Sequence, residues 1–214
     1  MRVVITGGPS SEPIDEVRIL TNTSTGELAV TLYDRFMDAG HDVDLLLGEG
    51  ARHGRDGARH FDRNETLARM LAGIAKAHRV DLVLHAAALA DFSVTPVDAA
   101  GTPMVAAKIP SRVEGVRLLL VPKPKIISDL RKLFGSAYLV GWKLEHDGDR
   151  AALIETARQQ LRANRLNACV VNGRAYGPGL GFCTEAGLVH DAPDKAAFAD
   201  FMVSFAAGGF RTYQ

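Results

Sequence analysis

The sequence has few cysteines, no excess of charge of either sign and no long hydrophobic run. Its two cysteines, Cys169 and Cys183, are too few for a disulfide framework or a zinc site, and their apolar neighbours predict buried free thiols. Lysine and arginine together number 25, as do aspartate and glutamate, and this balance argues against a general nucleic-acid binder. Because no run of about eighteen apolar residues occurs, no membrane-spanning helix is predicted.

The length and composition of the chain are those of an ordinary globular protein. Its 214 residues are enough for one domain with a sizeable core. An apolar strand pattern begins at residue 2, so no signal peptide is predicted, and free cysteines are typical of the cytoplasm. We therefore expect a single cytoplasmic domain over residues 1–214 that binds neither nucleic acid nor membranes.

The chain opens with the pattern of a buried strand followed by a ligand-binding loop. Val3, Val4 and Ile5 are β-branched and apolar, as in a strand of a parallel sheet. Gly7 and Gly8 follow at once, where a tight turn lets a ligand approach the backbone. About fifteen loop-forming residues come next, and a loop of this length in a compact domain is usually functional or disordered.

The helix after this loop begins late, near Ser24, Thr25 and Gly26. These residues suit a helix N-cap, and the free N–H groups of a helix start suit an anion. Neither the dinucleotide pattern G-x-G-x-x-G nor the Walker pattern G-x-x-x-x-G-K-[ST] occurs here. From spacing alone, an anion-binding loop and an ordinary strand-to-helix connection are equally good interpretations.

Strand and helix patterns then alternate along most of the chain. This alternation, with short separators, predicts an α/β fold of Rossmann-like type: a mostly parallel sheet with helices on both faces. The predicted strands are 42–47, 60–63, 81–86, 137–142, 167–171 and 182–189, and the predicted helices are 28–39, 65–79, 124–134, 149–164 and 192–206.

The alternation breaks between residues 92 and 121. Prolines and glycines divide this region into short segments, and it ends in a strand pattern at 116–121. Such an excursion is usually a lid or an oligomer contact. We therefore expect an extended arm that leaves the sheet.

Ligands of open α/β sheets bind at the carboxyl ends of the strands. After the strand 81–86, Ala87 and Ala88 are small enough for a planar ligand to lie against the backbone. Asp91 either binds a sugar hydroxyl or base amine or caps a turn. Trp142, at the end of another strand, either stacks on a base or fills a half-buried position.

The segment from Thr6 to Gly26, TGGPSSEPIDEVRILTNTSTG, closely resembles the opening motif of the phosphopantothenate–cysteine ligases (phosphopantothenoylcysteine synthetases). These enzymes form the DNA/pantothenate metabolism flavoprotein C-terminal domain family. Further segments resemble motifs of that family in the same order: AAALADF at 86–92, KIPS at 108–111, VPKPKII at 121–127 and GWKLE at 141–145.

The resemblance implies a stand-alone ligase of coenzyme A biosynthesis that lacks the flavin-binding decarboxylase half, so no FMN is expected. The carboxylate of 4′-phosphopantothenate would attack the α-phosphate of CTP or ATP, carried with Mg²⁺, and the amine of L-cysteine would attack the resulting acyl-nucleotidylate. Lys108 is implied to act in the first step and Asn22 in the second, and the arm is implied to pair with a second subunit in a homodimer. No metal site on the protein is implied, and the implied nucleotide contacts are Gly7, Gly8, Ser24, Thr25, Gly26, Ala87, Ala88, Asp91, Lys123, Pro124 and Trp142.

Some positions depart from the family's pattern, namely Glu27, Ala29, Trp142 and Gly173. Gln160 and Asn164 stand where fused members carry lysines that help to bind CTP, which leaves CTP and ATP open. The departures motivate an alternative, a non-catalytic nucleotide-binding protein that keeps the fold. A nicotinamide oxidoreductase is a weaker interpretation, because the chain has neither a G-x-x-G-x-x-G turn nor a Y-x-x-x-K pair.

Overall fold

Eight strands form one sheet at the centre of the computed structural model, which describes residues 1–211. The last three residues of the predicted domain therefore lie outside the described part. The strand order is β12-β11-β10-β9-β6-β1-β4-β5, and all neighbours pair in parallel except at β11 and β12. The strands are β1 (Arg2–Gly7), β4 (Asp42–Gly48), β5 (Arg59–Phe61), β6 (Leu82–His85), β9 (Tyr138–Leu144), β10 (Ala168–Asn172), β11 (Leu180–Thr184) and β12 (Gly187–Ala192).

The chain order reverses between β1 and β6. From β1 the chain continues to β4 and β5 on one side, and from β6 it continues to β9 and β10 on the other. Such a switch point opens a crevice at the carboxyl ends of the strands, where open α/β sheets bind their ligands. The Rossmann-like fold predicted from the sequence is confirmed.

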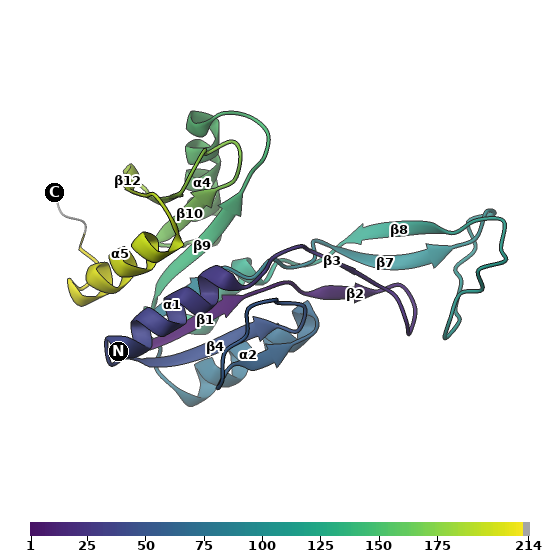
Figure 1. Ribbon diagram of the computed structural model, residues 1–214, viewed down its shortest axis with the longest axis horizontal. Coiled ribbons are helices and arrows are strands. Elements are labelled where there is room, and N and C mark those ends of the chain that lie inside the picture. The colour runs from purple at the N-terminus through teal and green to yellow at the C-terminus, as the bar shows by residue number, and fades with distance from the viewer. Residues whose placement is uncertain (212–214) are drawn as a thin grey trace.

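Helices cover both faces of the sheet (Figure 1). Side chains alternate along a strand, so Val3 and Ile5 of β1 enter one core and Val4 enters the other. The first core lies under α1 (Glu27–Asp38) and α5 (Lys195–Ala207), and the second under α2 (Asn64–Ala77) and α3 (Leu130–Phe134). On the same side as the second core, α4 (Arg150–Asn164) packs on β10 and β11.

The two cysteines lie opposite each other in the β10–β11 pair. Both are buried and free, as the sequence predicted. Burial raises the pKa of the Cys169 thiol to about 12 and that of Cys183 to about 11. Both are therefore neutral thiols at pH 7 and do not have the character of reactive cysteines.

Three elements differ from the sequence prediction. The loop expected over residues 9–22 contains a hairpin of β2 (Ser11–Pro13) and β3 (Ile19–Thr21), because Asp15 accepts the N–H groups of Val17 and Arg18 and closes a tight turn. The strand expected at 182–189 is split into β11 and β12 by a turn that ends at Gly187, whose φ is +109°. The helix expected from Pro124 is a 3₁₀ turn (Ile126–Ser128) followed by the short α3.

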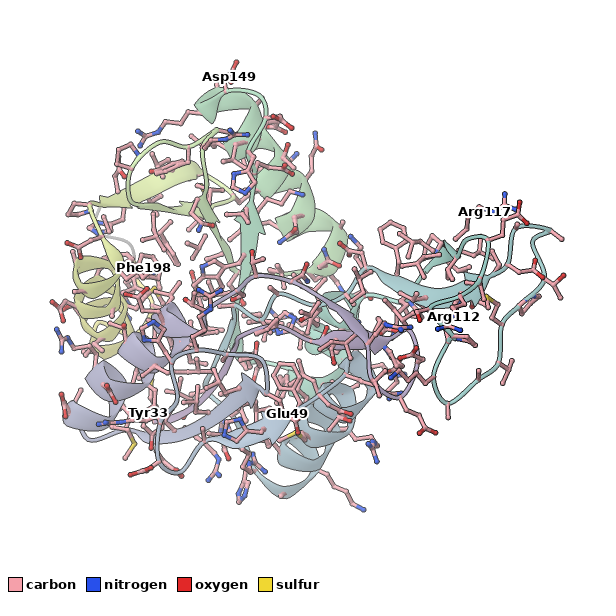
Figure 2. The ribbon with its side chains drawn as sticks, turned by 45° about the vertical axis from the view of Figure 1, so that its right-hand side comes forward. Tyr33, Glu49, Arg112, Arg117, Asp149 and Phe198 are labelled. Carbon is pink, nitrogen blue, oxygen red and sulfur yellow. The ribbon has the colours of Figure 1, made fainter. Side chains whose placement is uncertain are left out.

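The predicted arm is present as a two-stranded antiparallel ribbon of β7 (Phe92–Val97) and β8 (Arg117–Pro122). Figure 1 shows this ribbon projecting from the body of the molecule, and Figure 2 places Arg112 and Arg117 on the projecting part. Every residue of β8 is exposed, including four consecutive apolar ones, residues 118–121. Within residues 1–211, no helix has the length and apolar character that would be needed to cross a membrane.

Candidate active site

A cleft of about 1180 Å³ lies at the carboxyl ends of β1, β6 and β9, beside the point where the strand order reverses. Concave sites of this order of size are typical of small-molecule binding. Most of its wall is formed by residues 7–8, 22–29, 85–91, 124–127, 142–144 and 193–196.

The cleft brings together eleven of the thirteen site residues predicted from the sequence, and their functional roles remain predictions. Lys108 and Lys123 are the two that do not line it. The eleven are Gly7, Gly8, Asn22, Ser24, Thr25, Gly26, Ala87, Ala88, Asp91, Pro124 and Trp142.

Close packing explains the glycines on one side of the cleft. Gly8 and Gly26 have φ angles of +71° and +78°, which other residues rarely adopt. A Cβ atom on Gly7 would lie 2.1 Å from the Cβ of Ala29, so α1 and β1 approach too closely for a side chain there. Gly26 caps α1 without a side-chain hydrogen bond, and the first residues of this helix line the cleft, so its positive end is placed where an anion could bind.

The side-chain amide of Asn22 forms hydrogen bonds with the segment after β6, which forms another wall of the cleft. Its Nδ2 donates to the carbonyl oxygens of Ala88 at 3.0 Å and Leu89 at 3.1 Å. These two bonds fix the orientation of the amide, so Oδ1 is directed away from this backbone as an acceptor. Ala90 is held from both sides as well, since its N–H donates to the Ser10 hydroxyl and its carbonyl accepts from Asn64. The small residues of this wall are therefore rigidly placed.

Lys123, one of the nucleotide contacts implied by the resemblance, does not line the cleft. Its ammonium contacts Glu12 and lies 2.8 Å from a carboxylate oxygen of Glu65, and its side chain is only 11% exposed. Burial lowers the pKa of Lys123, but the hydrogen bonds to the two carboxylates outweigh this and raise it above its usual range. Lys125, two residues further on, does line the cleft; it is exposed and lies 3.3 Å from Asp91.

Lys108 lies on the arm, in the loop between β7 and β8. Its side chain is exposed, and it is not among the cleft-lining residues. The sequence match located this lysine on the arm but gave no information about its distance from the strand ends.

Trp142 packs against the protein on one side of its ring. The ring meets Phe198 of α5 edge to face, with centroids 6.1 Å apart. Its indole Nε1 is buried and has no hydrogen-bond partner in the described part of the chain. The packing role considered for Trp142 is thus observed, and stacking on a base stays a prediction.

Two further groups at the cleft were missed by the sequence analysis. His85 ends β6, with its Nδ1 2.9 Å from the Thr6 hydroxyl, and burial lowers its pKa to about 4. A lone histidine on an apolar strand is usually a core residue, so nothing singled it out. Lys195, at the start of α5, forms an ion pair with Glu27, at the start of α1. The one signal in the sequence that could have pointed to Lys195 is Glu27, which departs from the family's pattern and needs a basic partner if it lies at the cleft.

The described residues contain no group of three or more histidine, cysteine, aspartate or glutamate side chains placed to hold a metal ion. The carboxylates that line the cleft already have partners. Glu27 pairs with Lys195, Asp91 pairs with Lys125, and Asp194 accepts the N–H of Ala197.

Comparison with known proteins identifies the family of the chain. The DNA/pantothenate metabolism flavoprotein C-terminal domain matches residues 1–204. The chain belongs to this family. Two relatives in it, both called coenzyme A biosynthesis bifunctional protein CoaBC, are those of Thermococcus kodakarensis (31% identical over 82% of this chain) and Methanocaldococcus jannaschii (29% over 80%). The matches cover 42% and 40% of those relatives, so the chain spans about two fifths of their length.

Two solved structures share the fold of this chain. The DNA/pantothenate metabolism flavoprotein from Streptococcus pneumoniae superposes with a TM-score of 0.84 at 22% identity, covering 99% of this chain and 100% of that one. A Cab2 mutant in complex with phosphopantothenate-cysteine superposes with a TM-score of 0.69 at 17% identity, covering 98% and 89%.

Proposed function

We propose that this chain is a ligase of coenzyme A biosynthesis that joins 4′-phosphopantothenate to L-cysteine through an acyl-nucleotidylate. The observation that carries the proposal is the convergence of four of the five sequence motifs, all except the one that contains Lys108, on one cleft at the switch point of the sheet. The names of the CoaBC relatives and the ligand of the Cab2 structure support the same substrates.

The chemistry follows from the need to activate a carboxylate. An oxygen of the phosphopantothenate carboxylate attacks the α-phosphorus of the nucleotide, and the bond to the β-phosphate breaks with release of pyrophosphate. The cysteine amine then attacks the acyl carbon and loses a proton, and the carbon–oxygen bond to the nucleotide breaks. The products are 4′-phosphopantothenoylcysteine, NMP and pyrophosphate.

The cleft offers groups suited to both steps. The turns at Gly7–Gly8 and Gly26 and the start of α1 present N–H groups to phosphate oxygens. The Oδ1 of Asn22 is an acceptor in a fixed orientation, suited to a hydroxyl of the intermediate or to the attacking amine. Ala87 and Ala88 leave room for a planar base against the backbone.

Lys108 serves the first step in this proposal, where an ammonium near the α-phosphate stabilises the growing charge. Because it lies outside the cleft of its own chain, it acts only after the arm closes over a bound nucleotide. The same arm exposes consecutive apolar side chains on β8, which fits the proposal of a homodimer in which arms pair.

Mg²⁺ enters with the nucleoside triphosphate as part of the substrate. The cleft fits this arrangement, because its carboxylates are partnered and the phosphate oxygens are the ligands that Mg²⁺ prefers. When bound, the ion neutralises charge on the triphosphate.

The test is pyrophosphate release by the purified chain with Mg²⁺, phosphopantothenate and each of CTP, ATP, UTP and GTP. Release that needs phosphopantothenate and occurs with CTP or ATP supports the ligase and shows which nucleotide it uses. Nucleotide binding without release would instead indicate a non-catalytic binding protein.

A further inference from the structure

The turn between β2 and β3 is tied to the arm by hydrogen bonds on both sides of Lys108. Before the lysine, the carbonyl of Ala107 accepts the N–H of Glu16 at 3.0 Å. After it, the N–H of Ile109 donates to Asp15 at 3.0 Å, and the carbonyl of Ile109 accepts from Arg18 at 3.2 Å. More than ninety positions separate the two segments in sequence, so this contact belongs to the tertiary structure.

Asp15 is the centre of this contact. Its side chain is 0% exposed, and its carboxylate accepts the N–H groups of Val17, Arg18 and Ile109 and an N–H of the Arg18 guanidinium at 2.7 Å. The hydrogen bond from Ile109 is the main cause that holds the pKa of this carboxyl below its usual value. A carboxylate removed from water needs such donors, and here one of the main ones belongs to the arm.

Within the arm loop, the residue that contacts Asp15 is buried and its two neighbours are exposed. Ile109 is only 2% exposed, whereas Lys108 and Pro110 on either side of it are exposed. The backbone at Lys108 is therefore pinned, while its ammonium remains free to reach a ligand.

We propose that Asp15 is a positioning residue for Lys108: it ties the lysine's backbone to the β2–β3 turn, so that turn and lysine move as one unit when the arm closes. This inference rests on the function proposed above for Lys108. A loop fixed in this way loses less conformational entropy on closing than a free one, which favours the reactive arrangement.

The test is the Asp15→Asn variant in the full chain. The new side chain keeps an oxygen for the N–H groups of Val17 and Arg18 but turns an NH₂ toward the N–H of Ile109 and the Arg18 guanidinium. It therefore removes the hydrogen bond to the arm and the Arg18 ion pair, while the backbone bonds that close the turn are kept. Asp98→Asn is the matched control, because Asp98 also accepts backbone N–H groups on the arm but makes no contact with the β2–β3 turn.

We expect Asp15→Asn to speed hydrogen exchange at Ile109 at least tenfold, with exchange in the central sheet unchanged. Pyrophosphate release is expected to fall at least tenfold in kcat with little change in the KM for nucleotide, and the Asp98→Asn variant is expected to match wild type. Since Asp15 acts through Lys108, the double variant Asp15→Asn/Lys108→Gln is expected to be no slower than Lys108→Gln alone.

Faster exchange at Ile109 with unchanged kcat would overturn the inference, and so would a double variant much slower than Lys108→Gln. An inactive wild-type chain would instead overturn the proposed function, and this inference with it. The two failures are therefore distinguishable.

Discussion

Glu27 and Lys195 form an ion pair at the cleft that joins the first turn of α1 to the first turn of α5. Both side chains line the same cleft, so the pair places a carboxylate next to the glycine turn proposed to hold phosphate. The hydrogen bond from Lys195 holds the pKa of Glu27 below its usual value, so this carboxylate is ionised at pH 7. A phosphate and Glu27 would thus compete for the same lysine.

This competition predicts that Glu27→Gln binds nucleoside triphosphate several-fold more tightly than wild type, because Lys195 is released and a negative charge is removed. The gain should shrink as salt is raised, since these groups are partly exposed and are screened. Isothermal titration calorimetry at two salt concentrations measures both effects. Glu185→Gln, which breaks the Arg162–Glu185 pair outside the cleft, is the control and should bind as wild type does. Weaker binding by Glu27→Gln would contradict the competition.

Replacing the arm lysine should stop the first chemical step. Lys108→Gln removes the charge that stabilises the α-phosphate in the transition state, and losses of this kind are about 10²–10³-fold in rate. Arg112→Gln removes a positive charge from the same arm loop and should leave the rate near that of wild type (Figure 2). Pyrophosphate release without cysteine is the measurement, and an unchanged rate in Lys108→Gln would remove this lysine from the mechanism.

Changing Asn22 should separate the two steps. Asn22→Asp replaces the Nδ2 that donates to Ala88 and Leu89 with an oxygen, so a carboxylate would face two carbonyl oxygens and turn away from its present orientation. We expect the acyl-nucleotidylate to form and accumulate, because the cysteine step loses its oriented acceptor. Mass spectrometry of acid-quenched reactions detects the intermediate. Normal formation of the final product by this variant would show that Asn22 is not required.

His85 should make the protein lose stability as the pH falls from about 6.5 to 4. Its folded-state pKa of about 4 lies below the ordinary 6.5, so in this range the unfolded chain binds a proton that the folded chain does not. The free energy of unfolding should fall by about 1.4 kcal/mol per pH unit from this group, or about 3 kcal/mol in all. In His85→Gln that part of the dependence is absent.

Urea unfolding at several pH values checks this prediction. The carboxyl groups also titrate below pH 5, so the quantity of interest is the difference between wild type and His85→Gln. His78→Gln, which changes an exposed histidine, should keep the wild-type dependence. An identical pH dependence in wild type and His85→Gln would mean that His85 does not resist protonation in the folded state.

The sequence predicted the sheet and its helices well, because their apolar periods are set by burial on one or two faces. It failed at residues 9–22, where the hairpin is stabilised by the carboxylate of Asp15 and not by an alternating apolar pattern. A buried carboxylate that accepts N–H groups from a distant segment leaves no periodic signal in the sequence.

The residues of the candidate site also fall into a group that the sequence predicted and a group that it did not. Glycines and alanines at strand ends were predicted, because chain connectivity alone brings them to one edge of the sheet. The orientations of Lys123 and Lys195 depend on acidic partners from distant segments, Glu12 and Glu27 respectively. Such pairings leave no local pattern in the sequence, so the position of Lys123 outside the cleft lining was not predicted and Lys195 was overlooked.

The most direct measurement follows the carboxylate oxygen through the reaction. Phosphopantothenate labelled with ¹⁸O in its carboxylate is incubated with the chain, Mg²⁺, cysteine and the nucleotide that supports pyrophosphate release. Formation of an acyl-nucleotidylate predicts that one ¹⁸O atom appears in the phosphate of the NMP. Label in inorganic phosphate, with NDP as the nucleotide product, would contradict the account.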